Sequence, residues 1–264
     1  MKIAVTGKGG VGKTTLTALL ARAFVEQGTR VLAIDADPSP CLGQALGFPA
    51  EDLDRLEPIA RMEALIYERT GAQPGTIGGY FKLNPRVDDL PDQFSVERSG
   101  VRLLELGAVE MGGAGCICPE SAVLRALVTH LLLRRDEVVL LDLYAGVEHL
   151  GRATADAVDA MLIVVEPTRR SLGTAAQIKD LAEDLRLARL YLVGSKVQTD
   201  EDRRLIEAGS PGLPVLGLFP LDEAVRQADL EGKAAYDLSP RLRRAAADLV
   251  QSVTRLAAES RTVT

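Results

Sequence analysis

The sequence contains no tryptophan, only three cysteines and few aromatic residues, which make up 4% of its 264 positions. Three cysteines cannot form a disulfide framework, so the fold depends on a buried apolar core, which a chain of this length can build. The sequence also lacks a run of about 18 apolar residues, the length that a membrane-spanning helix requires, and a secretory segment after Met1. We therefore expect a cytoplasmic protein without a membrane partner.

The chain has no excess of basic residues. Lysine and arginine total 31 against 37 aspartate and glutamate residues, which gives a formal net charge of −6 at pH 7. An acidic chain is poorly suited to coating a nucleic acid, so we expect no nucleic-acid partner. Apolar residues at 47% and charged residues at 26% are typical of a packed globular protein, not of a disordered or coiled-coil chain.

Short apolar segments alternate with longer amphipathic ones, which is typical of an α/β fold: a mostly parallel, twisted β-sheet with helices on both faces. We expect about seven strands, at residues 2–6, 31–36, 101–106, 138–143, 160–166, 189–195 and 214–218. Helices are expected at residues 13–27, 119–133, 171–187, 201–208, 222–229 and 240–259. Residues 70–100 break the pattern, and we interpret them as a long ordered loop inserted in a single domain that spans residues 1–264.

A phosphate-binding motif follows the first predicted strand and reads Gly7-Lys8-Gly9-Gly10-Val11-Gly12-Lys13-Thr14-Thr15. It matches the P-loop pattern G-x-x-x-x-G-K-S/T, between a strand and a helix as that motif requires. The glycines let backbone amides turn around phosphate oxygens, and the helix N-terminus adds positive potential. Lys13 is expected to hold the β and γ phosphates, Thr14 to bind Mg²⁺ and Thr15 to bond the α phosphate. The alternative is a glycine-rich turn without a ligand.

Carboxylates follow two of the predicted strands. Asp35 and Asp37 end the strand at 31–36, and Asp142 lies in the strand at 138–143. The carboxyl ends of parallel strands form the edge at which open α/β sheets bind ligands, so these residues are candidates for phosphoryl-transfer chemistry. The alternative for Asp35 and Asp37 is a helix cap or a turn before Pro38.

Two cysteines, Cys116 and Cys118, lie one residue apart on a glycine-rich segment before a predicted helix. A soft metal in a tetrahedral or square-planar site needs four donors, whereas one chain offers two here, so two chains are required. The alternative is a pair of small buried residues, because the C-x-C spacing alone is a weak signal. The third cysteine, Cys41, is interpreted as a packing residue.

Lys8, a second lysine directly after the first glycine of the motif, resembles the deviant P-loop ATPases, a class that includes the nitrogenase iron protein and the MinD and ParA positioning ATPases. The resemblance implies that Lys8 reaches across a homodimer to the partner's nucleotide and stabilises the charge that develops on the phosphate. Hydrolysis then depends on nucleotide-promoted dimerisation. The alternative is a solvated loop lysine.

The same resemblance assigns two switches. It implies that Asp37 orients or deprotonates the attacking water and that Asp35 supports the Mg²⁺ shell. The segment at 142–146 is similar to the D-x-x-A-G second switch, which implies that Asp142 binds magnesium through water and that the amide of Gly146 approaches the γ phosphate. Loss of that phosphate after hydrolysis would release the loop of this second switch.

Base recognition is also assigned by resemblance. The class usually places Asn-Lys after a late strand, whereas this chain has Ser195 followed by Lys196, and serine cannot make the bidentate contact of asparagine. Main-chain groups at Pro220, Leu221 and Asp222 form the other base-contacting segment in the class. The resemblance implies ATP and leaves GTP open.

Segments at 115–120, 145–152 and 81–85 resemble the accessory ATPases that insert nickel during carbon monoxide dehydrogenase maturation. This similarity runs from Met1 to about Leu238. It implies that Cys116 and Cys118 of two chains hold Ni²⁺ or Zn²⁺ at a dimer interface and that apo carbon monoxide dehydrogenase is the client. A nitrogenase-type Fe–S redox ATPase is a further reading, but that type carries a cysteine in its second switch and residues 143–151 have none.

A positioning ATPase of the MinD or ParA type is the alternative function. It requires a surface that binds a membrane or DNA. The predicted helix at 240–259 has an apolar stripe that includes Leu242, Leu249, Val253 and Leu256, with arginines near its start, and such a helix can bind lipid. A stripe at this spacing is more typical of a face that covers the core.

Overall fold

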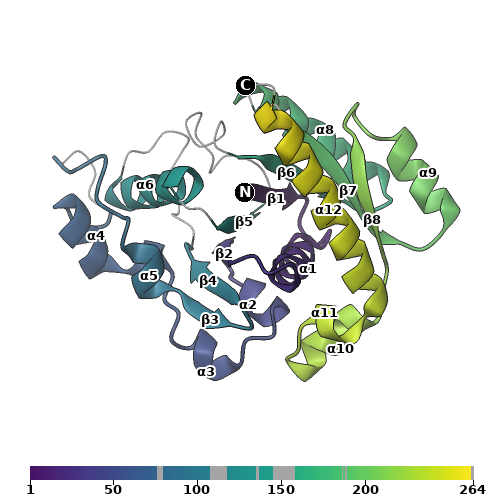
Figure 1. The fold of residues 1–264 in the computed structure, drawn as a ribbon. Helices are drawn as coiled ribbons and strands as arrows, with labels where there is room; N and C mark the ends of the chain where they lie inside the picture. Colours follow the sequence, from purple (N-terminus) through teal and green to yellow (C-terminus); the bar gives the residue numbers. More distant parts are fainter. Residues whose placement is uncertain are drawn as a thin grey trace.

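The computed structural model describes residues 1–75, 80–107, 118–134, 137–144, 158–185, 187 and 189–262. Within these ranges, eight strands form one sheet in the order β3-β4-β2-β5-β1-β6-β7-β8 (Figure 1). The strands are β1 (Lys2–Gly7), β2 (Val31–Ala36), β3 (Val96–Arg98), β4 (Val101–Glu105), β5 (Val138–Leu143), β6 (Ala160–Val165), β7 (Leu190–Val197) and β8 (Val215–Pro220). All neighbouring strands are parallel except β3 and β4. The expected α/β fold is confirmed, with one strand more than the seven expected.

Every helix that the sequence predicts is present, with ends shifted by a few residues. The helices of the described residues are α1 (Lys13–Glu26), α2 (Leu42–Ala45), α3 (Ala50–Leu53), η1 (Ile59–Arg61), α4 (Glu63–Thr70), α5 (Leu90–Phe94), α6 (Pro119–Arg134), α8 (Arg169–Asp184), α9 (Asp200–Ala208), α10 (Ala224–Glu231), α11 (Ala235–Leu238) and α12 (Pro240–Thr262). Most of the helices that the sequence did not predict have three to five residues, too few for an amphipathic period to show.

Apolar side chains cover both faces of the sheet. On one face, α1 and α12 pack against each other and against the strands, with Phe24 and Leu249 in the same buried cluster. On the other face, Leu127 of α6, Ile178 of α8 and Ile206 of α9 belong to a second buried cluster. The sheet is therefore the middle layer of three, and the loops at the carboxyl ends of its strands are free to form a site.

The apolar stripe of α12 belongs to the core. Leu242, Leu249 and Val253 are at most 2% exposed. This confirms the core-covering interpretation of the stripe and leaves these side chains unable to insert into a lipid surface.

The segment at 70–100 contains regular structure, so its interpretation as a loop was wrong in part. It holds α5 and β3, and β3 pairs antiparallel with β4 through Val96 and Leu103. β3 has only three residues, and Glu97 and Arg98 are exposed, so its sequence shows no alternation that would predict a strand. Asp89 anchors the segment through a bidentate pair with Arg69, at 2.9 and 2.6 Å.

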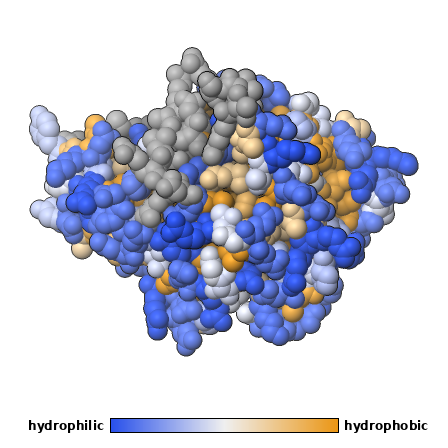
Figure 2. All heavy atoms as spheres, in the orientation of Figure 1, coloured by the Kyte–Doolittle hydropathy of each residue, from blue (hydrophilic) through white to orange (hydrophobic). Residues whose placement is uncertain are grey.

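The surface is mixed in character. Figure 2 shows a mostly hydrophilic face broken by small hydrophobic patches, as is usual for a folded domain. Among the helices of the described residues, none has both the length and the apolar character needed to cross a membrane.

Candidate nucleotide-binding site

The phosphate loop joins the end of β1 to the start of α1, in the middle of the sheet between β5 and β6. Gly7, with φ 146°, is required at the start of the loop, because a Cβ there would lie 2.4 Å from the carbonyl oxygen of Val164. Gly10 and Gly12 have φ of 82° and 97°, which L side chains rarely adopt. The glycines that the motif places here therefore allow the loop to wrap in front of the first turn of α1.

The two lysines of the loop have different surroundings. Lys13 is 8% exposed, and its Nζ lies 3.5 Å from the carbonyl oxygen of Lys8, so its charge is held within the curve of the loop. Lys8 is partly buried. The structure thus places the Lys13 ammonium inside the curve of its own loop, and its contact with phosphate and the function of Lys8 across a dimer stay predictions.

Asp142 lies beside the loop, on β5, in register with Val5 of β1 and Asp35 of β2. It is 2% exposed, and neither of its carboxylate oxygens has a hydrogen-bond partner among the described residues. Burial raises the pKa of Asp142 to about 7; the charges of Asp35 and Asp37 add to the rise, while Thr14 and Lys13 oppose it. An orphaned buried carboxylate beside the Thr14 hydroxyl is a donor set that fits Mg²⁺.

Asp35 shapes the first switch. Its Oδ1 accepts the amide of Asp37 at 3.0 Å, and its Oδ2 accepts the amides of Cys41 and Leu42, each at 2.9 Å. Burial raises its pKa and outweighs the opposing effect of these amides. The Asp35 carboxylate therefore holds residues 37–42 in a tight turn. Any support that Asp35 gives to a bound Mg²⁺ would come from this turn.

Asp37 projects from the same turn and is partly buried. Its Oδ1 accepts the amide of Ser39 at 2.9 Å, which is the local turn interaction that the sequence offered as an alternative. This bond orients the Asp37 carboxylate within the turn, and it does not prevent the carboxylate from also accepting a hydrogen bond from water.

Glu105 is a neighbour that the sequence analysis missed. It ends β4, in register with Asp35. Burial raises its pKa to about 7, with the charge of Asp35 adding to the rise and Arg61 opposing it. Its position at the end of a predicted strand was the available signal, but the order of the strands, and hence its neighbours, cannot be read from one sequence.

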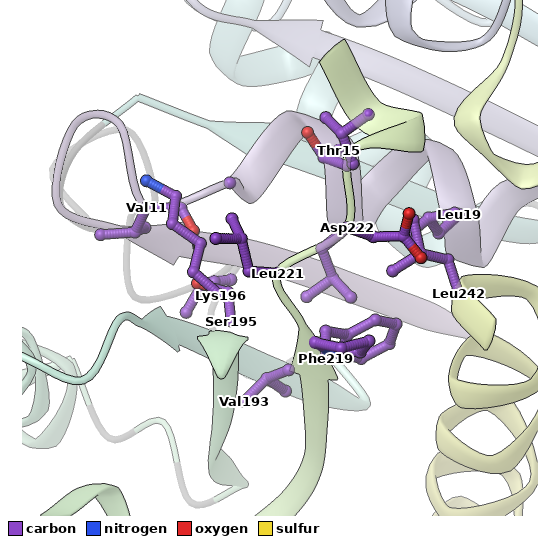
Figure 3. Close-up of a pocket in the computed structure, with 15 residues that line it drawn as sticks. Val11, Thr15, Leu19, Val193, Ser195, Lys196, Phe219, Leu221, Asp222 and Leu242 are labelled. Carbon is purple, nitrogen blue, oxygen red and sulfur yellow. The ribbon is translucent and has the colours of Figure 1, made fainter. Parts of the chain in front are cut away.

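An apolar pocket lies between the phosphate loop and the last two strands (Figure 3). The pocket has a volume of about 100 Å³ and is lined mainly by apolar side chains that include Leu19, Val193 and Phe219. It adjoins a larger cavity of about 510 Å³, and Thr15, Leu221 and Asp222 line both. Together they offer an apolar slot of the kind that adenine enters, at the segment that the sequence predicted.

Both carboxylate oxygens of Asp222 accept hydrogen bonds from other residues of the chain. Its Oδ2 accepts the hydroxyl of Ser239 at 2.6 Å, and its Oδ1 accepts the amide of Ala224 at 3.0 Å. These bonds, the Ser239 hydroxyl first, lower its pKa. Of the main-chain groups at 220–222, the Leu221 amide donates to the Val197 carbonyl at 3.0 Å and the Asp222 carbonyl accepts the Val225 amide at 3.1 Å, so base recognition by the remaining main-chain groups stays a prediction.

The structure contradicts the interpretation of Cys41 as a packing residue. It is exposed, and its Sγ lies 3.8 Å from the Thr14 hydroxyl, because the Asp35 bond to its own amide brings it to the loop. Burial of part of the side chain raises the pKa of this thiol. The position of Cys41 could not be predicted from the sequence, because it depends on a turn that the buried Asp35 carboxylate holds.

Cys118 is described, whereas Cys116 and Gly146 lie outside the described residues. Cys118 immediately precedes α6, is 7% exposed, and lies with its Sγ 2.8 Å from the Ser121 hydroxyl. The described residues contain no cluster of three or more His, Cys, Asp or Glu side chains that could hold a metal ion. The cysteine pair therefore remains a prediction.

Comparisons with known proteins agree with this geometry. A family model described as the CobQ/CobB/MinD/ParA nucleotide binding domain matches residues 2–235. The chain is 50% identical over 243 residues to the carbon monoxide dehydrogenase accessory protein CooC of Rhodospirillum rubrum, which covers 92% of each chain. It is 48% identical over 236 residues to an uncharacterised ATP-binding protein of Methanocaldococcus jannaschii, covering 88% of this chain and 90% of that one.

A solved structure gives the same fold. The MinD cell division protein of Aquifex aeolicus matches 96% of both chains with a TM-score of 0.68 at 19% identity. The phosphate loop with its two lysines, the orphaned Asp142 and the family match lead to one conclusion: the chain is a P-loop ATPase that belongs to the CobQ/CobB/MinD/ParA nucleotide-binding family.

Proposed function

We propose that this chain is an ATP-dependent metallochaperone, which binds nickel as a homodimer and assists its insertion into apo carbon monoxide dehydrogenase. One observation carries the proposal: the 50% identity, over 92% of each chain, to a protein named as a carbon monoxide dehydrogenase accessory protein. Identity at this level along the whole length supports a shared function more strongly than the fold does. We expect the chain to work in the cytoplasm, where thiols stay reduced.

The phosphate loop binds the triphosphate in this proposal. Backbone amides of residues 7–13 face its oxygens, Lys13 contacts the β and γ phosphates, and Thr15 contacts the α phosphate. Thr14 and Asp142 hold Mg²⁺, with Asp35 supporting them through the first switch. When bound, Mg²⁺ neutralises charge that develops on the phosphate oxygens.

Hydrolysis uses the two switches and a second chain. Asp37 orients the attacking water and accepts its proton, while Gly146 of the second switch donates its amide to the γ phosphate. Lys8 of each chain contacts the nucleotide of the other, which makes turnover depend on dimerisation. Its position in the loop, next to the first glycine, supports this assignment.

The cargo site lies at the dimer interface. Cys116 and Cys118 of both chains together supply four thiolates, the number that a tetrahedral or square-planar Ni²⁺ or Zn²⁺ site takes. Cys118 lies immediately before α6, where the helix N-terminus favours a thiolate, whereas burial raises the pKa of this thiol in the single chain, so a bound cation would be needed to hold it as the thiolate. Closure of the dimer on ATP would then couple the nucleotide to the metal.

Metal content tests the proposal directly. The purified protein is titrated with Ni²⁺ and Zn²⁺, with and without ATP, and bound metal is measured by elemental analysis after gel filtration. We expect one metal ion per two chains, lost in Cys116→Ser and in Cys118→Ser. Cys41→Ser is the matched control, because Cys41 is an exposed thiol that the proposal places outside the metal site, so its substitution should leave the count unchanged.

Two results would contradict the proposal. A metal content that survives both substitutions would remove the interface site. A visible absorption band with bound iron and sulfide would instead identify an Fe–S protein.

A further inference from the structure

The end of β7 contacts the back of the phosphate loop. The Ser195 hydroxyl lies 2.6 Å from the carbonyl oxygen of Val11 and 3.1 Å from that of Val165, and Ser195 is 9% exposed. The Lys196 ammonium donates to the carbonyl oxygen of Gly10 at 2.6 Å and pairs with Glu166 at 3.2 Å. Two consecutive side chains of β7 thus hold two consecutive carbonyls of the loop.

An irregularity in β7 makes this possible. Successive residues of a regular strand point to opposite faces, so neighbours such as Ser195 and Lys196 would not reach the same loop. The pairing of β7 with β8 shifts register between Gly194 and Val197, and Lys196 has φ 55°. A bulge of this kind redirects a side chain and is common next to active sites.

The backbone of Lys196 is in a costly conformation. A left-handed conformation is unfavourable for a residue with a side chain, and among the described residues only Ser99 and Lys196 adopt it without being glycine. Strain that persists at a site is evidence that the surrounding contacts require it. Here the contact that depends on the left-handed conformation of Lys196 is the hydrogen bond from its ammonium group to the Gly10 carbonyl.

The hydrogen bonds to the carbonyls of Gly10 and Val11 also orient the amides of the residues that follow them. In a trans peptide the C=O and N–H groups point in opposite directions, so carbonyls of Gly10 and Val11 that face β7 turn the amides of Val11 and Gly12 away from it. The Val11 amide makes only a long contact, 3.4 Å, with the carbonyl oxygen of Lys8, which a phosphate oxygen can replace. The positive charge of Lys196 at Gly10 further polarises the peptide group that carries the Val11 amide.

We propose that Ser195 and Lys196 are positioning residues for triphosphate: they hold the phosphate loop with its amides directed at the phosphates. Figure 3 shows Lys196 extending beside Val11, with Ser195 at the end of the same strand, close to Leu221 of the base pocket. The Ser195 hydroxyl is committed to backbone carbonyls, so it does not select the base. Base selection then depends on the apolar pocket and the main chain at 220–222. This inference concerns the nucleotide site of the ATPase and holds whether or not the chain carries nickel.

Displacement of a fluorescent ATP analogue tests the proposal. The competitors are ATP and inorganic tripolyphosphate, each with Mg²⁺, because tripolyphosphate has no base. For Ser195→Ala and for Lys196→Met we expect the inhibition constants of both competitors to rise by the same factor, on the order of tenfold. Ser195→Thr retains the hydroxyl and should restore most of the affinity for both.

Matched controls are available in the same chain. The Ser210 hydroxyl donates to a carbonyl at 2.6 Å and Lys179 pairs with Glu183 at 2.6 Å, and neither residue lines the two cavities, so Ser210→Ala and Lys179→Met should leave both constants unchanged. If Ser195→Ala does not fold, Lys196→Met decides alone, since Lys196 lies near the surface. A loss confined to ATP would identify a base contact and overturn the proposal, as would unchanged constants for both competitors.

Discussion

The Asp142 carboxylate is buried, and neither of its oxygens has a hydrogen-bond partner among the described residues. Burying an ionised carboxylate in this way lowers the stability of the ligand-free protein. Its pKa rises from an ordinary 3.8 to about 7 because of burial first, and then because of the nearby charges of Asp35 and Asp37. An unfolded aspartate ionises near pH 4, so the folded chain binds the extra proton between about pH 4 and pH 7. The stability of the ligand-free protein should therefore fall as the pH rises through that window, by up to about 4 kcal/mol.

Asp142→Asn should remove this penalty. At pH 8 we expect the ligand-free variant to be more stable than the wild type by about 2 to 4 kcal/mol, with little difference near pH 4, because asparagine does not ionise. The same variant should lose Mg²⁺-dependent ATP binding. Urea denaturation at several pH values and calorimetric titration measure the two effects.

Asp202→Asn is a control of opposite sign. The amides of Gln198 and Thr199 lower the pKa of Asp202, so its substitution should destabilise the protein at neutral pH and leave ATP binding intact. If Asp142→Asn were as destabilising as this control, the buried Asp142 carboxylate would not lack hydrogen-bond partners in the way that the structure shows.

Residues whose function depends on a local motif could be predicted from the sequence. Gly7, Lys13 and Thr14 lie where the motif places them, since the strand, loop and helix that form it are consecutive. The placement of Cys41 beside Thr14 and of Glu105 beside Asp35 could not, because both depend on strand order or on a turn around a buried carboxylate.

At the scale of the elements, β1 and β6 lie so close at the loop that only glycine fits. Gly7→Ala would place a methyl group 2.4 Å from the Val164 carbonyl oxygen, at a φ of +146°. We expect this variant to lose at least about 2 kcal/mol of stability and most of its ATP affinity, because the end of β1 must move.

Gly9→Ala is the matched control for that variant. A Cβ at Gly9 meets no atom within 4 Å, so the protein should fold and melt as the wild type does. Thermal melting followed by circular dichroism compares the two. Equal melting temperatures would show that β1 and β6 are not packed as described.

The elements that the sequence predicted are the ones with a strong pattern. Buried strands such as β2 and β5 are continuously apolar apart from their terminal acids, and α8 carries a clear apolar face. β3 and the helices of one turn carry no such pattern; β3 is positioned by its pairing with β4, and α2 and α11 by packing against α1.

At the scale of the whole molecule, the account requires two chains. Lys13→Ala should abolish ATP binding, because it removes the charge inside the loop. Lys8→Ala should retain ATP binding and lose both turnover and ATP-promoted dimerisation, because Lys8 acts on the partner's nucleotide. Phosphate release and gel filtration measure these properties, and normal hydrolysis by Lys8→Ala would contradict an action across the dimer.

Native mass spectrometry of the wild-type protein with Ni²⁺ and a non-hydrolysable ATP analogue tests the central claim, since one spectrum counts chains, nucleotides and metal ions together. We predict a species with two chains, two nucleotides and one nickel ion. A protein that stays a single chain under saturating analogue and retains no nickel would contradict the account.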